Sequence, residues 1–187
     1  YQRGYKWEAQ EVNELLDDLW EFYRNSEAGQ FYCLQPIVVS EISTDKYNVI
    51  DGQQRLTTIY LILSYLKDKI VEDNYRSDFF FFFYKTRKNS ESYLQDEKFR
   101  EGINDDNIDF YYISTAFQTI DGWFKKNPGS KGKITNLLLD SEDSTNKNVK
   151  FIWYDLGNEK PVDAFIRLNV GKIPLTDAEL IKALLLQ

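Results

Sequence analysis

The sequence predicts an α+β fold. Short apolar runs of strand length occur between longer segments in which apolar residues recur at helical spacing. The chain has 187 residues, of which 42% are hydrophobic, so it is long enough for one substantial core. It contains no internal repeat and no low-complexity linker. We therefore predict a single domain over residues 1–187, with the core in residues 1–90 and a mainly helical part in residues 91–187.

The first half of the chain is predicted to contain two helices and three strands. Residues 8–24 have apolar positions at helical spacing and an acidic outer face. Residues 31–42 and 46–50 have the composition of strands and are separated by a polar turn. Helical spacing returns over residues 56–71. The aromatic run 79–84 is expected to be a strand that is covered on both faces.

The second half is predicted to be richer in helices. Residues 109–126 form a long amphipathic pattern that ends at an N-P-G-S turn. Residues 133–140 are ambiguous, and a strand is expected at residues 149–156. A proline at the first position favours a helix over residues 161–168. A T-x-x-E capping box that begins at Thr176 predicts the start of the last helix.

The composition excludes several kinds of chemistry. With no histidine and one cysteine, Cys33, the chain cannot form a zinc site of the usual N/S type, a Ser-His-Asp triad or an internal disulfide. A single cysteine fits a reducing cytoplasm, which is the expected localisation, and no apolar run reaches the length of a membrane span. The net charge of −7 disfavours binding of nucleic acid over the whole surface. The absence of methionine and an end within an apolar helical pattern lead us to expect an N-terminal domain of a longer protein.

The most informative segment is D-G-Q-Q-R, residues 51–55, which joins a predicted strand to a predicted helix. Such a junction presents backbone N–H groups and the positive end of a helix dipole, which suits a phosphate. Gly52 would let a ligand approach the backbone closely, and Arg55 could bind phosphate oxygens in bidentate fashion. No Walker A or G-x-G-x-x-G motif accompanies the segment, so the common nucleotide folds are not supported.

The other three residues of the D-G-Q-Q-R segment are polar and could take part in catalysis. Asp51 could hold Mg²⁺ or position a water molecule, while Gln53 and Gln54 could orient a phosphate or a nucleophile. The alternative interpretation is purely structural, since these side chains could equally cap the helix and satisfy the turn. From spacing alone, the two interpretations remain open.

Four separated motifs resemble the GmrSD-type N-terminal domain family, which is related to the ParB/sulfiredoxin-like fold. They are Y-Q-R-x-Y-x-W at residues 1–7, I-D-G-Q-Q-R-L-T-T at 50–58, F-x-R-L-N-x-G at 165–171 and a closing E-L-I-K-A segment within 177–185. They occur in the family's order and extend over essentially the whole chain. The resemblance implies a ParB/sulfiredoxin-like core, with a mixed sheet flanked by helices and a helical C-terminal part.

The resemblance also implies a function. It indicates the domain that binds and hydrolyses a nucleoside triphosphate in a modification-dependent (type IV) restriction or anti-phage DNA endonuclease of prokaryotes. The implied cofactors are Mg²⁺ and the nucleoside triphosphate. The implied partners are modified DNA, bound by the full-length protein, and a C-terminal HNH-type nuclease domain or subunit. The alternative function is a nucleotide-sensing or DNA-binding regulatory module without hydrolysis of its own.

The family motifs assign candidate site residues. Catalysis is assigned to Asp51, Gln53, Gln54 and Arg55, with Asp51 as the metal ligand. Nucleotide and phosphate binding is assigned to residues of the first three motifs and to the lysine that follows the third: Gly52, Arg55, Thr57, Thr58, Gln2, Arg3, Tyr5, Arg167, Asn169 and Lys172. For the first motif the alternative is an arm packed on the sheet. For the third motif it is helix capping and exposed charge.

A local basic cluster could contact DNA in this acidic chain. It consists of Lys125, Lys126, Lys131 and Lys133. The alternative is that lysines near a helix end complement the helix dipole.

Overall fold

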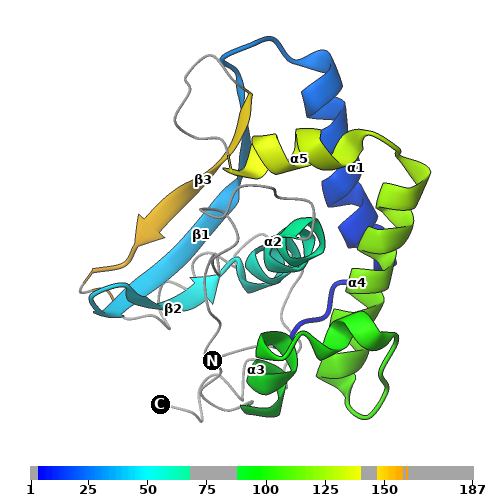
Figure 1. Cartoon of the computed structure of the whole chain (residues 1–187). Coiled ribbons are helices and arrows are strands. Elements are labelled where there is room, and N and C mark those ends of the chain that lie inside the picture. Colours follow the sequence, from blue (N-terminus) through cyan, green and yellow to red (C-terminus); the bar gives the residue numbers. More distant parts are fainter. Residues whose placement is uncertain (1–3, 68–87, 140–146, 158, 160–187) are drawn as a thin grey trace. The chain divides into compact units, whose positions relative to one another are not determined.

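The computed structural model describes residues 4–67, 88–139, 147–157 and 159 (Figure 1). In chain order the elements are α1 (Ala9–Asn25), β1 (Phe31–Ser43), β2 (Lys46–Asp51), α2 (Gln53–Leu66), α3 (Lys88–Gln95), η3 (Lys98–Glu101), α4 (Ile108–Lys126), α5 (Ser130–Leu139) and β3 (Asn148–Asp155). Helices and strands in the described part of the chain confirm the α+β class. The ParB/sulfiredoxin-like core remains a prediction.

Most of the predicted elements that fall on described residues are confirmed within one or two positions. The start of α2 was predicted too late, because its first turn, Gln53 to Arg55, is polar and has no apolar periodicity. The ambiguous segment is helix α5. Helix α3 and the 3-10 turn η3 were missed, since they are short and mostly polar. The predicted strand at 79–84 and the helices at 161–168 and after Thr176 lie outside the described residues.

The three described strands form one sheet in the order β2-β1-β3 (Figure 1). Strands β1 and β2 are antiparallel and are joined by a tight turn at Asp45, which has a φ of 61°. Strand β3 runs parallel to β1, because the N–H of Asn148 donates to the Gln30 carbonyl and the N–H of Leu156 donates to the Val39 carbonyl. The sheet is therefore mixed, as predicted.

The contacts within the chain divide it into two compact units. One contains Gln35–Gln53 and the described residues from Phe151 onward, and so holds most of the sheet. The other contains Gly4–Leu34 and the described residues of Gln54–Lys150, and so holds the helices. Each unit draws on both halves of the sequence. The expected organisation, with a core in residues 1–90 and a mainly helical part in residues 91–187, stays a prediction.

The core of the helical unit lies where α1 packs against α4 and α5 (Figure 1). Helix α1 begins where the Glu8 N–H donates to the Glu11 carboxylate, and it buries four aliphatic residues at helical spacing: Val12, Leu15, Leu16 and Leu19. Helix α4 begins at Asn107, whose side chain accepts two backbone N–H groups. Its buried stripe includes Ile113, Phe117, Ile120 and Phe124. Each such side chain contributes about 1.5 to 3 kcal/mol through burial.

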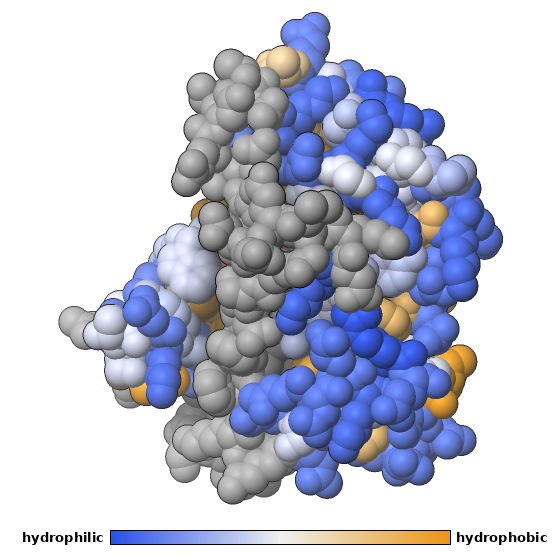
Figure 2. Space-filling model, viewed as in Figure 1, coloured by the Kyte–Doolittle hydropathy of each residue, from blue (hydrophilic) through white to orange (hydrophobic). Residues whose placement is uncertain are grey.

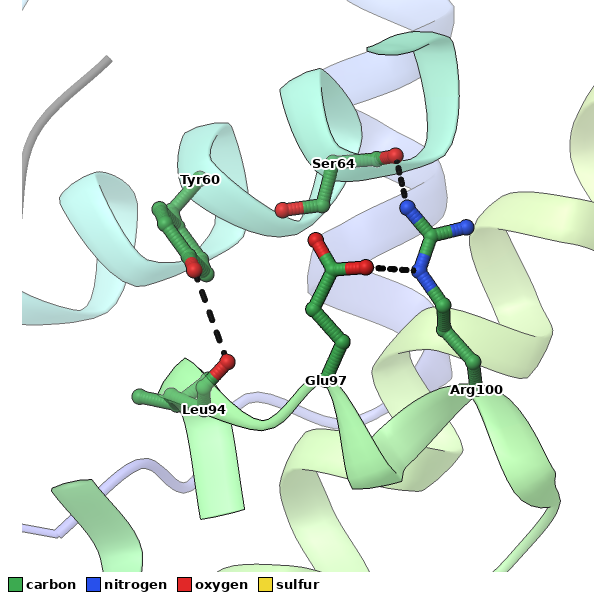
Figure 3. A network of polar contacts seen from close by, with 5 residues as sticks. All are labelled: Tyr60, Ser64, Leu94, Glu97 and Arg100. Carbon is green, nitrogen blue, oxygen red and sulfur yellow. Dashed lines mark hydrogen bonds and ion pairs between the residues drawn. The ribbon is translucent and has the colours of Figure 1, made fainter. Parts of the chain in front are cut away.

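A polar network ties η3 and the end of α3 to helix α2 (Figure 3). The Arg100 guanidinium donates to the Ser64 carbonyl on α2, and its Nε lies 2.7 Å from a Glu97 carboxylate oxygen. The Tyr60 hydroxyl donates to the Leu94 carbonyl at 3.5 Å. The Arg100 guanidinium also lies 5.4 Å from the ring centroid of Phe117. One arginine therefore joins η3 to both α2 and α4.

Hydrophilic residues predominate on the described surface in the view of Figure 2, and the apolar residues seen there are scattered. This matches a chain in which 28% of the residues are charged. The large apolar side chains that are exposed include Ile103 and Ile108 in the helical unit, and Ile152 and Trp153 on β3.

Candidate functional site

The D-G-Q-Q-R segment begins at a bulge in strand β2. Val38 of β1 faces Asp51, and the next residue, Val39, faces Val49, so Ile50 is the extra residue of β2. The side chain of Ile50 packs against Val38 and Leu156, which anchors the bulge in the core of the sheet. Bulges re-aim the residues beside them. The bulge thus sets the direction in which the chain presents Asp51, which is partly buried and has bonding partners.

Gly52 makes the change from strand to helix possible. Its φ is 96°, in the left-handed region that residues with a side chain rarely adopt, and the residue is buried. The next residue, Gln53, is already the first residue of α2. Because the turn takes only one residue, the carboxylate of Asp51 is separated by a single glycine from the positive end of the α2 dipole.

Gln53 and Gln54 use their side-chain amides to hold backbone groups. The Gln53 Nε2 donates to the Val49 carbonyl at 2.7 Å, which ties the start of α2 back to β2. The Gln54 Nε2 donates to the Gly4 carbonyl at 2.9 Å, and its Oε1 accepts the N–H of Lys6 at 2.8 Å. The Gln54 amide therefore pairs with the N-terminal segment in the way that a neighbouring strand would.

Tyr5 and Thr58, which were both assigned to nucleotide binding, contact each other. Their hydroxyl oxygens lie 2.9 Å apart, and both residues are buried. The Thr58 hydroxyl also donates to the Gln54 carbonyl at 3.0 Å. Residues 4–6 are thus bound to the first two turns of α2 by one amide and one pair of hydroxyl groups. The sequence carries no signal for the part played by Gly4 and Lys6, because only their backbone groups take part.

Arg55 and Thr57 complete the described part of the site. Arg55 lies in the first turn of α2, and it is partly buried and has bonding partners. Its Nε atom is buried. Thr57 is 3% exposed, so its hydroxyl faces the protein interior. The predicted site residues Gln2, Arg3, Arg167, Asn169 and Lys172 lie outside the described residues.

The site offers few ligands for a metal ion. In residues 4–67, 88–139 and the described positions after 146, no three carboxylate or cysteine side chains are grouped so that they could enclose a cation. Asp51 supplies the one carboxylate of the D-G-Q-Q-R segment. This donor set fits Mg²⁺ bound together with phosphates, since Mg²⁺ commonly takes one or two carboxylates and completes its shell with water and phosphate oxygens.

The D-G-Q-Q-R segment contains three groups of a kind that can bind an anion or a phosphate ester. They are the N-terminal end of α2, the guanidinium of Arg55 and the backbone of Gly52, which carries no side chain. The only negative charge in the segment belongs to Asp51, at the end of β2.

None of the described helices has the combination of length and apolar character that a bilayer span needs.

The comparison with protein families gives one match over nearly the whole chain. Residues 1–186 match the family described as GmrSD restriction endonuclease, N-terminal domain. The comparison with curated proteins gives no match. The family match confirms the resemblance seen in the four motifs, of which the D-G-Q-Q-R segment is the best described in the structure. This chain belongs to the GmrSD restriction endonuclease N-terminal domain family.

Proposed function

We propose that this domain binds a nucleoside triphosphate with Mg²⁺ at the D-G-Q-Q-R segment and hydrolyses it to support a DNA endonuclease. The observation that carries the proposal is the one-residue turn at Gly52, with Asp51 on one side and the first turn of α2, including Arg55, on the other. Membership of a restriction endonuclease family supports the association with DNA cleavage.

The charges of the segment suit a bound phosphate chain. The buried glycine and the N-terminal end of α2 would face phosphate oxygens, which the helix dipole attracts. The guanidinium of Arg55 would neutralise the charge that develops on the transferred phosphoryl group. In hydrolysis, water attacks the γ-phosphorus, the bond from that atom to the bridging oxygen breaks, and the nucleoside diphosphate leaves with the electron pair.

Asp51 is the residue that would hold Mg²⁺. When bound, such an ion neutralises charge on the phosphate oxygens that it contacts. The chain's own contribution is to keep the carboxylate at a fixed direction, through the bulge at Ile50 and its packing on Val38. Residues Gln2 and Arg3 immediately precede Gly4 in the sequence, and we propose that they complete the phosphate site. We propose the same role for Arg167, Asn169 and Lys172.

A second function, a nucleotide sensor without hydrolysis, is favoured by the hydrogen bonds of the two glutamines. Gln53 and Gln54 were predicted to orient a phosphate or a nucleophile, yet their amides form hydrogen bonds with the backbone of Val49, Gly4 and Lys6. An amide that is held in this way has less freedom to position a water molecule. Binding without turnover would support the sensor.

The test compares nucleotide binding and phosphate release for the wild type, Asp51→Asn and Arg55→Ala, with Mg²⁺ and each of the four ribonucleoside triphosphates. We expect either substitution to lower kcat/KM by about 100-fold, as loss of a group that acts in the transition state does. Asp45→Asn is the matched control, since Asp45 has a left-handed φ of 61° in the adjoining β1–β2 turn, where asparagine is equally acceptable.

The two functions give different results in this assay. Saturable turnover that is lost in Asp51→Asn and retained in Asp45→Asn supports hydrolysis at this segment. Saturable binding with no phosphate release supports the sensor. If the wild type binds no nucleotide, both functions are wrong and the D-G-Q-Q-R segment has only its structural role.

We also propose, from the family alone, that the full-length protein acts on modified DNA in the prokaryotic cytoplasm. In this proposal an HNH-type nuclease domain or subunit makes the cut, because the present chain has no histidine for such a site.

A further inference from the structure

We infer that a group of cations around Tyr23 is a docking surface for the phosphate backbone of duplex DNA. The group, called here the Tyr23 cluster, consists of Trp20, Tyr23, Arg24, Lys133 and Lys147. It lies in the helical unit, where the C-terminal end of α1 packs against α5 (Figure 1). It shares no residue with the D-G-Q-Q-R segment, and the inference does not depend on nucleotide hydrolysis.

Two lysines converge on one tyrosine. The Lys133 Nζ lies 4.8 Å from the centroid of the Tyr23 ring and 3.0 Å from its hydroxyl oxygen. The Lys147 Nζ lies 5.1 Å from the same centroid and donates to the Tyr23 carbonyl at 2.6 Å. The two ammonium groups are therefore within about 10 Å of each other, a distance comparable to the Debye length at physiological salt, so their fields add.

Within the part of the chain that the structure describes, no ion pair involves the cations of the Tyr23 cluster. This holds for Arg24, Lys133 and Lys147. Glu21 and Glu27 are three residues away from Arg24 on either side, and neither forms an ion pair with it. Two other lysines of the helical unit are paired, Lys98 with Asp96 and Lys125 with Asp121, whereas Lys6, Lys126 and Lys150 form no ion pair with a described residue.

The positions of the cations relative to the helices separate structural from functional roles. Arg24 lies in the last turn of α1, and Lys147, which directly precedes β3, donates to the Tyr23 carbonyl near that helix end. Positive charge there complements the dipole of α1. Lys131 and Lys133 sit instead at the beginning of α5, where positive charge opposes the dipole. The expectation that lysines here complement a helix end is therefore wrong for these two. Their placement breaks a local rule, which is typical of a functional site.

Duplex DNA is the partner that best fits these observations. The protein as a whole carries a charge of −7, so a polyanion can approach favourably only at a local concentration of positive charge. The aromatic rings of the cluster are already occupied, because Trp20 stacks on Tyr23 with centroids 5.6 Å apart and cations cover both rings. Rings in this state do not serve as platforms for unstacked bases, which favours contact with the backbone of a duplex.

The test measures binding of the full chain to a labelled 20-base-pair duplex by fluorescence anisotropy, without nucleotide, over a series of salt concentrations. Three phosphate contacts, one for each cation of the cluster, predict that the logarithm of affinity falls with the logarithm of salt concentration with a slope of about −2 to −3. We expect Lys133→Gln to weaken binding about 3- to 10-fold and to reduce the steepness of this slope by about one.

Lys98→Gln is the matched control, because it removes the same charge from an exposed lysine on η3. It should change affinity less than 2-fold, as expected of a lysine that contacts no phosphate. The slope does not depend on the fraction of active protein, so it stays informative if a variant is partly unfolded. Equal effects of Lys133→Gln and Lys98→Gln, absence of binding by the wild type, or tighter binding of single-stranded DNA or RNA would overturn the inference. If no nucleotide hydrolysis is detected but the salt dependence of DNA binding changes as expected in Lys133→Gln, the proposed function is wrong and the docking surface is still supported.

Discussion

Replacement of Gln54 by alanine tests whether this glutamine holds the N-terminal segment or acts in catalysis. The substitution removes the hydrogen bonds to the Gly4 carbonyl and to the N–H of Lys6. Each bond contributes about 1 kcal/mol, and the carbonyl of the buried Gly4 loses its partner, so we expect a loss of about 2 to 3 kcal/mol in the free energy of unfolding. For a chain of this length, the melting temperature should fall by about 5 to 10 °C.

Thermal unfolding and amide hydrogen exchange measure the two consequences separately. The melting temperature reports the total loss, and the exchange rate of the Lys6 amide reports the bond to Gln54 directly. Gln10→Ala is the matched control, since Gln10 makes one exposed hydrogen bond to Glu14 on the surface of α1 and should change stability by less than about 0.5 kcal/mol. If Gln54→Ala leaves both the melting temperature and the Lys6 exchange unchanged, the assigned role of this amide is wrong.

Three further predictions concern stability. Gly52→Ala should lower the free energy of unfolding, measured by urea denaturation, by about 1 to 2 kcal/mol, because the φ of 96° disfavours a side chain. Gly52→Asn should lower the free energy of unfolding less, and equal losses in the two variants would contradict this reason. Arg100→Met should cost about 2 kcal/mol by removing the bond to the Ser64 carbonyl and an ion pair, whereas an unchanged midpoint would show that the network is dispensable. Burial, followed by the hydrogen bond to Asp18 and the negative charge of Asp18, raises the pKa of the Tyr32 hydroxyl above its ordinary value of 10.0. The neutral form of Tyr32 therefore stabilises the fold below pH 10, and this contribution is lost as the pH rises through the raised pKa. NMR titration of labelled tyrosine should show this pKa falling in Asp18→Asn, and no change would exclude Asp18 as a cause.

Local sequence patterns were sufficient for the long helices and for the strands. Helices α1 and α4 carry apolar stripes of four or more residues, so each could be recognised from a single window of sequence. Helices α3 and α5 are 8 and 10 residues long, and their short apolar pattern gives little periodicity. Their stability depends on neighbouring elements, such as the contact of α5 with α1.

The D-G-Q-Q-R segment could be recognised as a candidate site, but the partners of its side chains could not. The strand, the glycine and the helix lie within a few residues of one another, so the junction at Gly52 follows from local order. The bulge at Ile50 escaped prediction because it depends on the register between β1 and β2. Likewise, that no described carboxylate pairs with Lys133 becomes visible only in the folded structure.

The α+β class, the family and the residues of the D-G-Q-Q-R segment could be read from the sequence, because short patterns of neighbouring side chains specify each of them. The partners of Gln54 and the cations that meet at Tyr23 depend on how the chain folds. Gln54 binds backbone groups of Lys6 and Gly4, which lie 48 and 50 residues away from it in the sequence, and Lys133 is 110 residues from Tyr23. The groups that accept or donate at Gly4 and Lys6 belong to the backbone, which every residue possesses, so no residue type could reveal them before the chain was folded.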